Sequence, residues 1–331
     1  MLRTLSVRHD RFALTRPFRI ARGEKIAADV ITVTLGEGGV TGRGEGVPYA
    51  RYDESIDSAI NAIEAIRSAI EAGADRTALA RFLPPGAARN ALDCAMWDLE
   101  ARLAGSDVAT LIGAPPPPRL ASALTVVIDT PEAMAAAAAD IADAPVIKVK
   151  VDATDPATRI RAVRAAAPDA ALIIDPNESW NEALVIALQD VLVEARVALL
   201  EQPVPAHDDA WLEHFTPRVP ICADESIHVA ADLPRVARRY QMVNVKLDKA
   251  GGLTAALELA HAARERGLGL MTGCMVSSSL SIAPALHVAR MSDFVDLDGP
   301  IWLKEDYPGG VRDEHGYLLP PAPGFWGTSC G

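Results

Sequence analysis

The sequence has few cysteines, no long apolar run and no excess of basic residues. Its cysteines are Cys94, Cys222, Cys274 and Cys330, and none belongs to a CxxC pair. In a chain of 331 residues this favours reduced thiols and a cytoplasmic protein over a disulfide framework. No run of 18 apolar residues predicts a membrane span, and residues 1–10 do not resemble a signal peptide. The net charge of -12 argues against nucleic acid as a partner, because it repels phosphate.

Two differently patterned regions follow one another along the chain. The first has strand patterns at 2–9, 29–35 and 40–44 and helical patterns at 54–71 and 87–104. Four consecutive prolines, at 115–118, then break the chain, because they can continue neither a helix nor a central strand. We therefore predict an α+β capping domain over 1–115 and a second domain over 120–309. The tail, about 310–331, is expected to fold back onto the capping domain.

The second region alternates short apolar runs with amphipathic helical stretches. The runs are 124–128, 146–151, 171–175, 197–201, 221–224, 242–247, 268–272 and 294–298. Eight buried strands separated by helices indicate parallel pairing. A doubly wound sheet would give the same alternation. An α/β barrel is favoured, because polar residues collect at the C-terminal ends of many different strands, where such a barrel builds its site.

Lysines occur at two of these strand ends. Lys148 and Lys150 are two residues apart, so their side chains point the same way, and each is expected to lower the pKa of the other. Lys246 lies four strands further on and faces them across the barrel mouth. Such lysines can remove and return a proton on opposite faces of one carbon. The alternative is a set of solvent-facing lysines.

Acidic residues end the strands between these lysines. Asp175, Glu201 and Asp224 close three consecutive strands, which places three carboxylates around one point. They would repel one another without a cation, and oxygen ligands suit Mg²⁺. Asp296 and Asp298, on the last strand, share one face and suit a substrate ammonium. The alternatives are independent helix caps and a polar strand terminus.

Read together, these positions resemble the muconate-lactonizing subgroup of the enolase superfamily, and most closely its L-Ala-D/L-Glu (dipeptide) epimerases. The resemblance covers almost the whole chain. It is carried by the strand-end residues and by the segments Pro17–Gly23, Gly86–Leu99, Val243–Gly252 and Asp296–Pro300. It implies a modified (β/α)7β TIM barrel with an N-terminal α+β capping domain.

The same resemblance implies the role of each residue. Asp175, Glu201 and Asp224 would bind Mg²⁺, and Lys150 and Lys246 would be the two acid/base residues, serving the (R) and the (S) substrate. The substrate-binding residues would be Arg22, Thr125, Lys148, Cys274, Asp296 and Asp298. Among these, Arg22 would pair with the glutamate side chain, and the segment 17–23 would be a mobile loop. Ser277 stands where many members of the subgroup carry a glutamate.

The implied reaction is inversion of the α-carbon of the C-terminal residue of L-Ala-D/L-Glu, through an enediolate. o-Succinylbenzoate synthase and muconate cycloisomerase are alternatives on the same scaffold, but their substrates carry no ammonium for Asp296 and Asp298. A non-catalytic barrel that serves as a binding module is an alternative of another class. The resemblance further implies a small dipeptide as substrate, a role in peptidoglycan peptide metabolism and a homo-oligomer.

Overall fold

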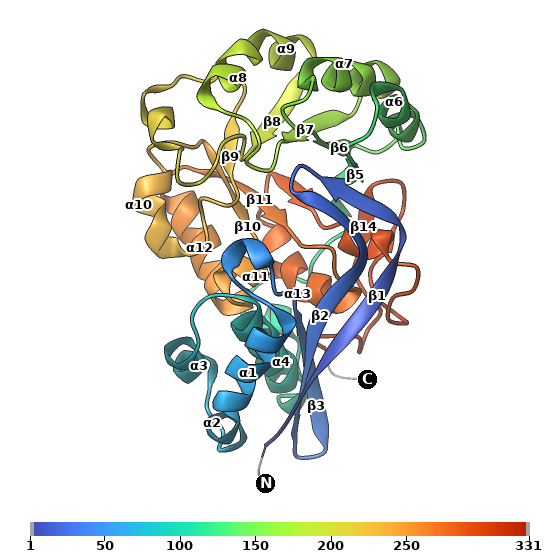
Figure 1. Cartoon of the computed structure of the whole chain (residues 1–331). Helices are drawn as coiled ribbons and strands as arrows, with labels where there is room; N and C mark the ends of the chain where they lie inside the picture. Colours follow the sequence, from blue (N-terminus) through green and yellow to red (C-terminus); the bar gives the residue numbers. More distant parts are fainter. Residues whose placement is uncertain (1–2, 329–331) are drawn as a thin grey trace.

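The computed structural model describes residues 3–328, so Cys330 lies outside the described residues. The chain forms a capping region and a barrel that lie against each other (Figure 1). The capping region consists of β1 (Thr4–Ile20), β2 (Gly23–Glu37), β3 (Val40–Gly46), η1 (Ala50–Tyr52), α1 (Ile56–Ala65), α2 (Arg67–Glu71), α3 (Arg76–Phe82), α4 (Ala87–Leu103) and α5 (Val108–Leu111).

The eight barrel strands are consecutive neighbours in one parallel sheet. They are β5 (Leu124–Val126), β6 (Val146–Lys150), β7 (Ala171–Asp175), β8 (Val197–Glu201), β9 (Ile221–Ala223), β10 (Met242–Val245), β11 (Gly269–Gly273) and β12 (Phe294–Asp296). The amide of Ala123 donates to the carbonyl of Val295 at 2.8 Å, which joins the first strand to the last. The predicted (β/α)7β barrel with an α+β cap is thereby confirmed, and the doubly wound sheet is excluded.

Helices and short strands surround this sheet. They are β4 (Leu120–Ala121), α6 (Pro131–Ala139), α7 (Pro156–Ala166), α8 (Glu182–Ala187), α9 (Gln189–Glu194), η2 (Ala210–His214), η3 (Ala230–Asp232), α10 (Leu233–Val236), α11 (Leu247–Ala250), α12 (Leu253–Glu265), α13 (Ser279–Ala289), η4 (Gly299–Trp302), β13 (Arg312–Asp313) and β14 (Tyr317–Leu319). Within residues 3–328, no helix is both long enough and apolar enough to cross a bilayer.

The side chains inside the barrel follow the two-residue period of the strands. On β6, Val146 belongs to an apolar cluster at the N-terminal end, whereas Lys148 and Lys150 follow it toward the C-terminal end. On β7, Ile173 belongs to the same cluster and Asp175 follows it. Because strand side chains alternate between faces, one apolar residue and the functional residues above it share the inward face.

The cap packs on the barrel through α4 and β3. An added Cβ at Gly44 would lie 2.2 Å from the Ala91 carbonyl oxygen, so only glycine permits this approach of strand and helix. Buried side chains tie α4 to the barrel: Arg89 donates to the carbonyls of Ala250 and Gly251, and Asp93 accepts from Thr254. These contacts fix the cap over the C-terminal ends of the barrel strands.

Two expectations about local structure were wrong. The helix predicted over 54–71 is interrupted at Ile66, whose backbone leaves the helical region (φ -110°). The segment 17–23, expected as a loop, contains the paired ends of β1 and β2, with Phe18 opposite Lys25. Backbone pairing extends this hairpin beyond the apolar pattern that the sequence shows.

The tail contacts both parts of the molecule. Its strand β14 pairs with β4, and the Gly327 amide donates to Asp98 of α4. The Trp326 indole donates to the carbonyl of Arg43 on β3 at 2.9 Å. The division into a capping domain over 1–115, completed by the tail, and a barrel domain over 120–309 stays a proposal that agrees with these contacts.

Candidate active site

Lys148 lies at the centre of the barrel mouth. Its ammonium is 2.7 Å from Glu201 Oε2, 2.7 Å from Asp296 Oδ2 and 3.1 Å from Asp175 Oδ2. Its side chain and those of Asp175 and Glu201 are almost completely buried. Asp296, on the last strand, is therefore linked to the acids of the third and fourth strands by this ammonium.

Lys150 and Lys246 each hold one acid of the triad. Lys150 Nζ donates to Asp175 Oδ2 at 2.5 Å, and Lys246 Nζ donates to Asp224 Oδ2 at 2.7 Å. Their strands, β6 and β10, are four positions apart in the ladder of eight. Half the circumference of the barrel separates them, so the two ammonium groups approach the mouth from opposite sides.

The acids, rather than the neighbouring lysines, control the protonation of two of these amines. Burial lowers the pKa of Lys148, but Asp296, Glu201 and Asp175 outweigh it, so the pKa lies well above its usual value. Asp224 likewise outweighs burial and raises the pKa of Lys246. For Lys148 the expected lowering of the pKa was wrong, because the carboxylates that raise it come from other strands.

The three carboxylates form an oxygen-only donor set. Burial, followed by the charge of Asp175, raises the pKa of Glu201. Burial also acts on Asp224, but Lys246 and Lys249 outweigh it and hold the pKa of Asp224 well below its usual value. Within residues 3–328, no three acidic, histidine or cysteine side chains are gathered as a preformed metal cluster. The ammonium groups of Lys148, Lys150 and Lys246 lie among these acids and neutralise part of their negative charge.

Asp296 and Asp298 line the side of the mouth formed by the last strand. Asp298 Oδ2 accepts from the Thr125 amide at 2.9 Å and from the Trp302 indole at 3.2 Å. Asp296 Oδ1 is buried and accepts no hydrogen bond from any residue of 3–328. Burial and the charge of Asp296 raise the pKa of Asp298 to about 6. This pair therefore has acceptor capacity left for a cationic ligand.

Cys274 follows β11 and lines the same cavity. Burial, reinforced by the charges of Asp296 and Asp298, raises the pKa of its thiol well above the usual value. A thiol in that state is a neutral wall of the cavity and a poor nucleophile.

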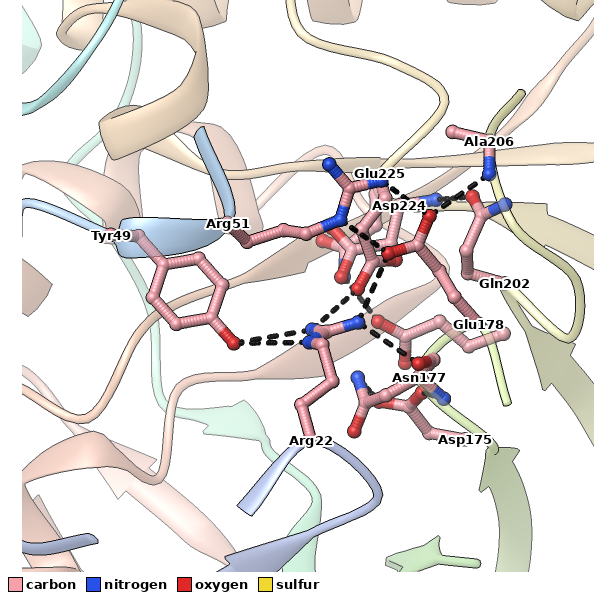
Figure 2. Close-up of polar contacts among 12 residues, drawn as sticks. Arg22, Tyr49, Arg51, Asp175, Asn177, Glu178, Gln202, Ala206, Asp224 and Glu225 are labelled. Carbon is pink, nitrogen blue, oxygen red and sulfur yellow. Dashed lines mark hydrogen bonds and ion pairs between the residues drawn. The ribbon is translucent and has the colours of Figure 1, made fainter. Parts of the chain in front are cut away.

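Arg22 extends from the tip of the β1–β2 hairpin toward the acids (Figure 2). Its guanidinium is 2.7 Å from Glu225 Oε1 and 3.2 Å from Glu178 Oε2, and it donates to the Tyr49 hydroxyl at 3.2 Å. Glu178 also accepts two hydrogen bonds from Arg51, at 2.7 and 2.8 Å. The hairpin and η1 are thereby tied to the loops that follow β7 and β9.

The cavity between cap and barrel has a volume of about 450 Å³, which suits a small organic substrate. Its lining contains all six predicted substrate-binding residues. Lys148, Lys150, Lys246 and Asp224, which also line it, form its floor on the barrel side. Asp175 and Glu201 lie below that floor, in contact with Lys148.

Sequence reasoning missed four residues of this site. Glu178 and Glu225 bind the cap, Lys249 donates to Asp224 Oδ1 at 2.5 Å, and Asn244 donates to Glu201 Oε1 at 2.8 Å. Glu225 follows Asp224 directly, and Asn244 and Lys249 flank Lys246, so proximity to the predicted residues was their only signal. Glu178 lies three residues after Asp175, but nothing in the sequence indicated its distant partners Arg22 and Arg51.

Two family models match the chain at these two structural regions. The mandelate racemase / muconate lactonizing enzyme N-terminal domain matches residues 2–113, and the enolase C-terminal domain-like model matches residues 132–327. The chain belongs to the enolase superfamily. Within it, the mandelate racemase / muconate lactonizing enzyme family supplies the match to the cap.

Named members of the superfamily are similar over nearly their full lengths. The L-Ala-D/L-Glu epimerase of Escherichia coli (strain K12) is 48% identical, over 96% of this chain and 99% of that protein. An N-acetyl-D-glutamate racemase from Pseudoalteromonas sp is 41% identical, over 90% and 95%.

Solved structures agree with this placement. An enolase family member from Agrobacterium tumefaciens, with bound sodium and L-Ala-L-Glu, superposes with a TM-score of 0.95 at 44% identity, covering 98% of this chain and 100% of that one. A dipeptide epimerase from Cytophaga hutchinsonii, complexed with Mg and D-Ala-L-Val, gives a TM-score of 0.91 at 27% identity, covering 100% and 96%.

Proposed function

We propose that this protein is a Mg²⁺-dependent dipeptide epimerase that interconverts L-Ala-L-Glu and L-Ala-D-Glu. The observation that carries the proposal is the pairing of two opposed lysines, Lys150 and Lys246, with a buried aspartate pair, Asp296 and Asp298, in one cavity. The similarity to the Escherichia coli epimerase over nearly the whole chain supports it. o-Succinylbenzoate synthase and muconate cycloisomerase activities are not favoured by these comparisons.

The substrate's ammonium is proposed to bind at Asp296 and Asp298. Asp296 Oδ1 is a buried acceptor without a hydrogen bond, and an ammonium there would satisfy it. The name of the Pseudoalteromonas relative gives an N-acylated amino acid as its substrate. Such a molecule has no ammonium group to place beside the two aspartates. The aspartate pair therefore favours a free dipeptide.

Asp175, Glu201 and Asp224 are the residues proposed to hold Mg²⁺. Their oxygen-only, buried and mutually repelling carboxylates fit a hard cation. When bound, the ion supplies positive charge to the substrate's carboxylate, whose oxygens become more negative as the α-proton leaves. Lys148 contributes a second positive charge beside the same acids.

Lys150 and Lys246 are proposed to exchange the α-proton on opposite faces. One amine takes the proton while the other, as an ammonium, donates a proton from the other side, so that the configuration inverts. The ion pairs to Asp175 and Asp224 hold both Nζ atoms at the mouth. Because inversion needs both residues, a single lysine can only remove and return a proton on one face.

A dipeptide library incubated in deuterated water tests the proposed function. We expect a mass gain of one deuterium and inversion for L-Ala-L-Glu and L-Ala-D-Glu, both abolished by EDTA and restored by Mg²⁺. N-Acetyl-glutamate serves as the competing substrate. Exchange with it but with no dipeptide would contradict the proposal and favour an N-acyl amino acid racemase.

We infer further that the enzyme acts in the cytoplasm on dipeptides released from peptidoglycan. The support is chemical: L-Ala-D-Glu contains a D-residue that ordinary protein turnover does not supply, and inversion makes the peptide an all-L dipeptide. A homo-oligomeric state stays a prediction.

A further inference from the structure

We propose that Gln202 is a positioning residue of the metal site, because its side chain fixes Asp224 relative to Glu201 beyond the point where their strands stop pairing. Gln202 directly follows Glu201 and is completely buried. This inference rests on the proposed function, in which Glu201 and Asp224 help to hold Mg²⁺. It adds a residue that acts on the ion only through two of its proposed ligands.

The pairing between β8 and β9 ends before the second of these acids. Its last pair joins Glu201 to Cys222, and the Gln202 amide donates to the Cys222 carbonyl at 2.8 Å. Asp224 follows the end of β9, so pairing with β8 does not orient it. Two acids that bind one cation must keep a defined spacing, and here that spacing depends on side-chain contacts.

The side-chain oxygen of Gln202 continues the connection between the two strand ends. Gln202 Oε1 accepts from the Asp224 amide at 2.9 Å and from the Ser226 amide at 3.1 Å. Figure 2 shows Gln202 and Asp224 in the same close-up. Asp224 and Ser226 are 1% and 2% exposed, so water does not replace these contacts. One acceptor thereby fixes the backbone from which the Asp224 carboxylate extends.

The backbone of Gln202 makes a further connection, to the preceding strand. Its carbonyl accepts from the Glu178 amide at 2.9 Å, in the loop that follows Asp175 and β7. Its φ of 31° lies in a region that few residues other than glycine adopt, and such a conformation persists where the surrounding contacts fix it. Gln202 therefore connects the ends of the three strands that supply Asp175, Glu201 and Asp224.

The side-chain nitrogen of Gln202 belongs to a buried network that fixes its direction. Nε2 shares its two hydrogens among the Val204 carbonyl, at 2.8 Å, and the hydroxyls of Ser226 and Tyr240, both at 3.0 Å. These hydroxyls lie 2.7 and 2.8 Å from Asp209 Oδ2. A carboxylate only accepts, so both hydroxyls donate to it and present their oxygens to Gln202. The glutamine amide can therefore point only one way, with its oxygen toward the two backbone amides.

The network ends at a buried charge. Asp209 is 1% exposed and forms an ion pair with Arg239. A buried polar network whose members are all bonded is rigid, whereas a buried amide that loses its acceptor is costly. Without the Gln202 side chain, the amides of Asp224 and Ser226 would have to find other acceptors. The loop would then shift, and the spacing between the acids would change.

The test measures Mg²⁺ binding by calorimetry in the full-length protein without substrate, so the readout does not depend on turnover. Gln202→Met keeps nearly the same side-chain length and removes both hydrogen-bonding groups. It should weaken Mg²⁺ binding by about 10–100-fold, as the loss of a residue that orients metal ligands commonly does. Mn²⁺, used as a spectroscopic probe, should give an altered electron paramagnetic resonance spectrum in this variant.

Gln189→Met is the matched control. Gln189 is also a buried glutamine bonded to backbone, since it accepts from the Arg218 amide and donates to the Val185 carbonyl, both at 2.9 Å. It lies on α9 and outside the cavity lining, so this variant should lose stability and keep its Kd for Mg²⁺. Tyr240→Phe removes one hydroxyl that holds the Gln202 nitrogen and should weaken Mg²⁺ binding severalfold.

An unchanged Kd for Mg²⁺ in folded Gln202→Met would overturn the inference, and so would an equal weakening in Gln189→Met. If Gln202→Met does not fold, Tyr240→Phe decides, because an unchanged Kd there contradicts the inference and a weaker one supports it. These results leave the proposed function intact as long as the unmodified protein binds Mg²⁺ and epimerises L-Ala-L-Glu. If the unmodified protein binds no Mg²⁺, the proposed function itself fails before any variant is compared.

Discussion

The two ends of the same barrel strands contain opposite kinds of side chain. At the N-terminal end, the inward positions pack as an apolar layer: Ala123, Val146, Ile173, Leu199, Cys222, Met242 and Met271. Two residues further along, the inward positions begin to be charged, as Lys148 on β6, Asp175 on β7 and Glu201 on β8 show. On these strands one end packs the core, and the other end supplies charged residues of the proposed active site.

The charged side chains at the C-terminal end are stabilised by ion pairs with one another and not by water. Lys148 is 1% exposed and Glu201 is completely buried, so neither is compensated by water. Buried ion pairs contribute little net stability, because desolvation offsets their attraction. Functional sites commonly concentrate such groups, and substitutions there can increase stability while removing activity. Substitutions at the charged end should therefore reduce activity more than stability, and substitutions at the apolar end should reduce stability more than activity.

The largest expected effect is on turnover at the charged end. Asp175→Asn, Glu201→Gln and Asp224→Asn should each lower kcat by about a thousandfold or more and weaken Mg²⁺ binding measured by calorimetry. Asp93→Asn is the matched control: this buried acid binds Thr254 outside the cavity and should keep both properties. Near-normal turnover without added metal in any two of the triad variants would show that these acids do not hold a required metal.

At the apolar end, we expect a loss of stability with little loss of turnover. Leu199→Ala removes a completely buried side chain and should destabilise the protein by about 2–5 kcal/mol, because a cavity remains. We expect a lower unfolding midpoint in urea, with kcat per folded molecule close to that of the unmodified protein. A large loss of kcat at full folding would mean that the apolar layer positions the site directly.

A smaller, pH-dependent gain in stability is expected at Asp298. Its pKa is about 6 in the fold and about 4 in an unfolded chain, so its ionised form destabilises the folded state. This penalty is absent below pH 4 and develops fully as the pH rises through 6. Asp298→Asn should therefore gain up to about 3 kcal/mol relative to the unmodified protein at pH 8 and little at pH 4. Thermal unfolding at both values measures it, and an equal gain at both would contradict the assigned cause.

The sequence predicted the barrel well because its strands are short, apolar and ended by polar residues. The observed bounds of β7 and β8 coincide with the predicted runs 171–175 and 197–201. The β1–β2 hairpin was predicted too short, because residues 10–28 are mostly exposed and pair through backbone atoms, which leave no regular apolar pattern in the sequence. Regular burial can be read from the sequence, whereas pairing between exposed strands cannot.

The candidate site was predicted in its strand-end residues and missed in its cross-connections. Lys150, Asp175 and Lys246 follow from strand periodicity, which is local. The contacts of Glu178 with Arg22 and Arg51 join segments more than 120 residues apart, as the separations of 156 and 127 residues show. The pKa of Lys148 likewise depends on acids from three other strands. Such properties emerge only when the strands are assembled.

The central claim is that Lys150 and Lys246 act on opposite faces of one carbon, and deuterium exchange in their single variants tests it most directly. Lys150→Ala and Lys246→Ala are incubated separately with L-Ala-L-Glu and L-Ala-D-Glu in deuterated water, and both inversion and mass gain are followed. We predict no inversion in either variant. Each should exchange the α-proton of only one epimer, with Lys150→Ala retaining the (S) substrate and Lys246→Ala the (R) substrate. Exchange of the same epimer by both variants, or inversion that survives in either one, would contradict the two-base account.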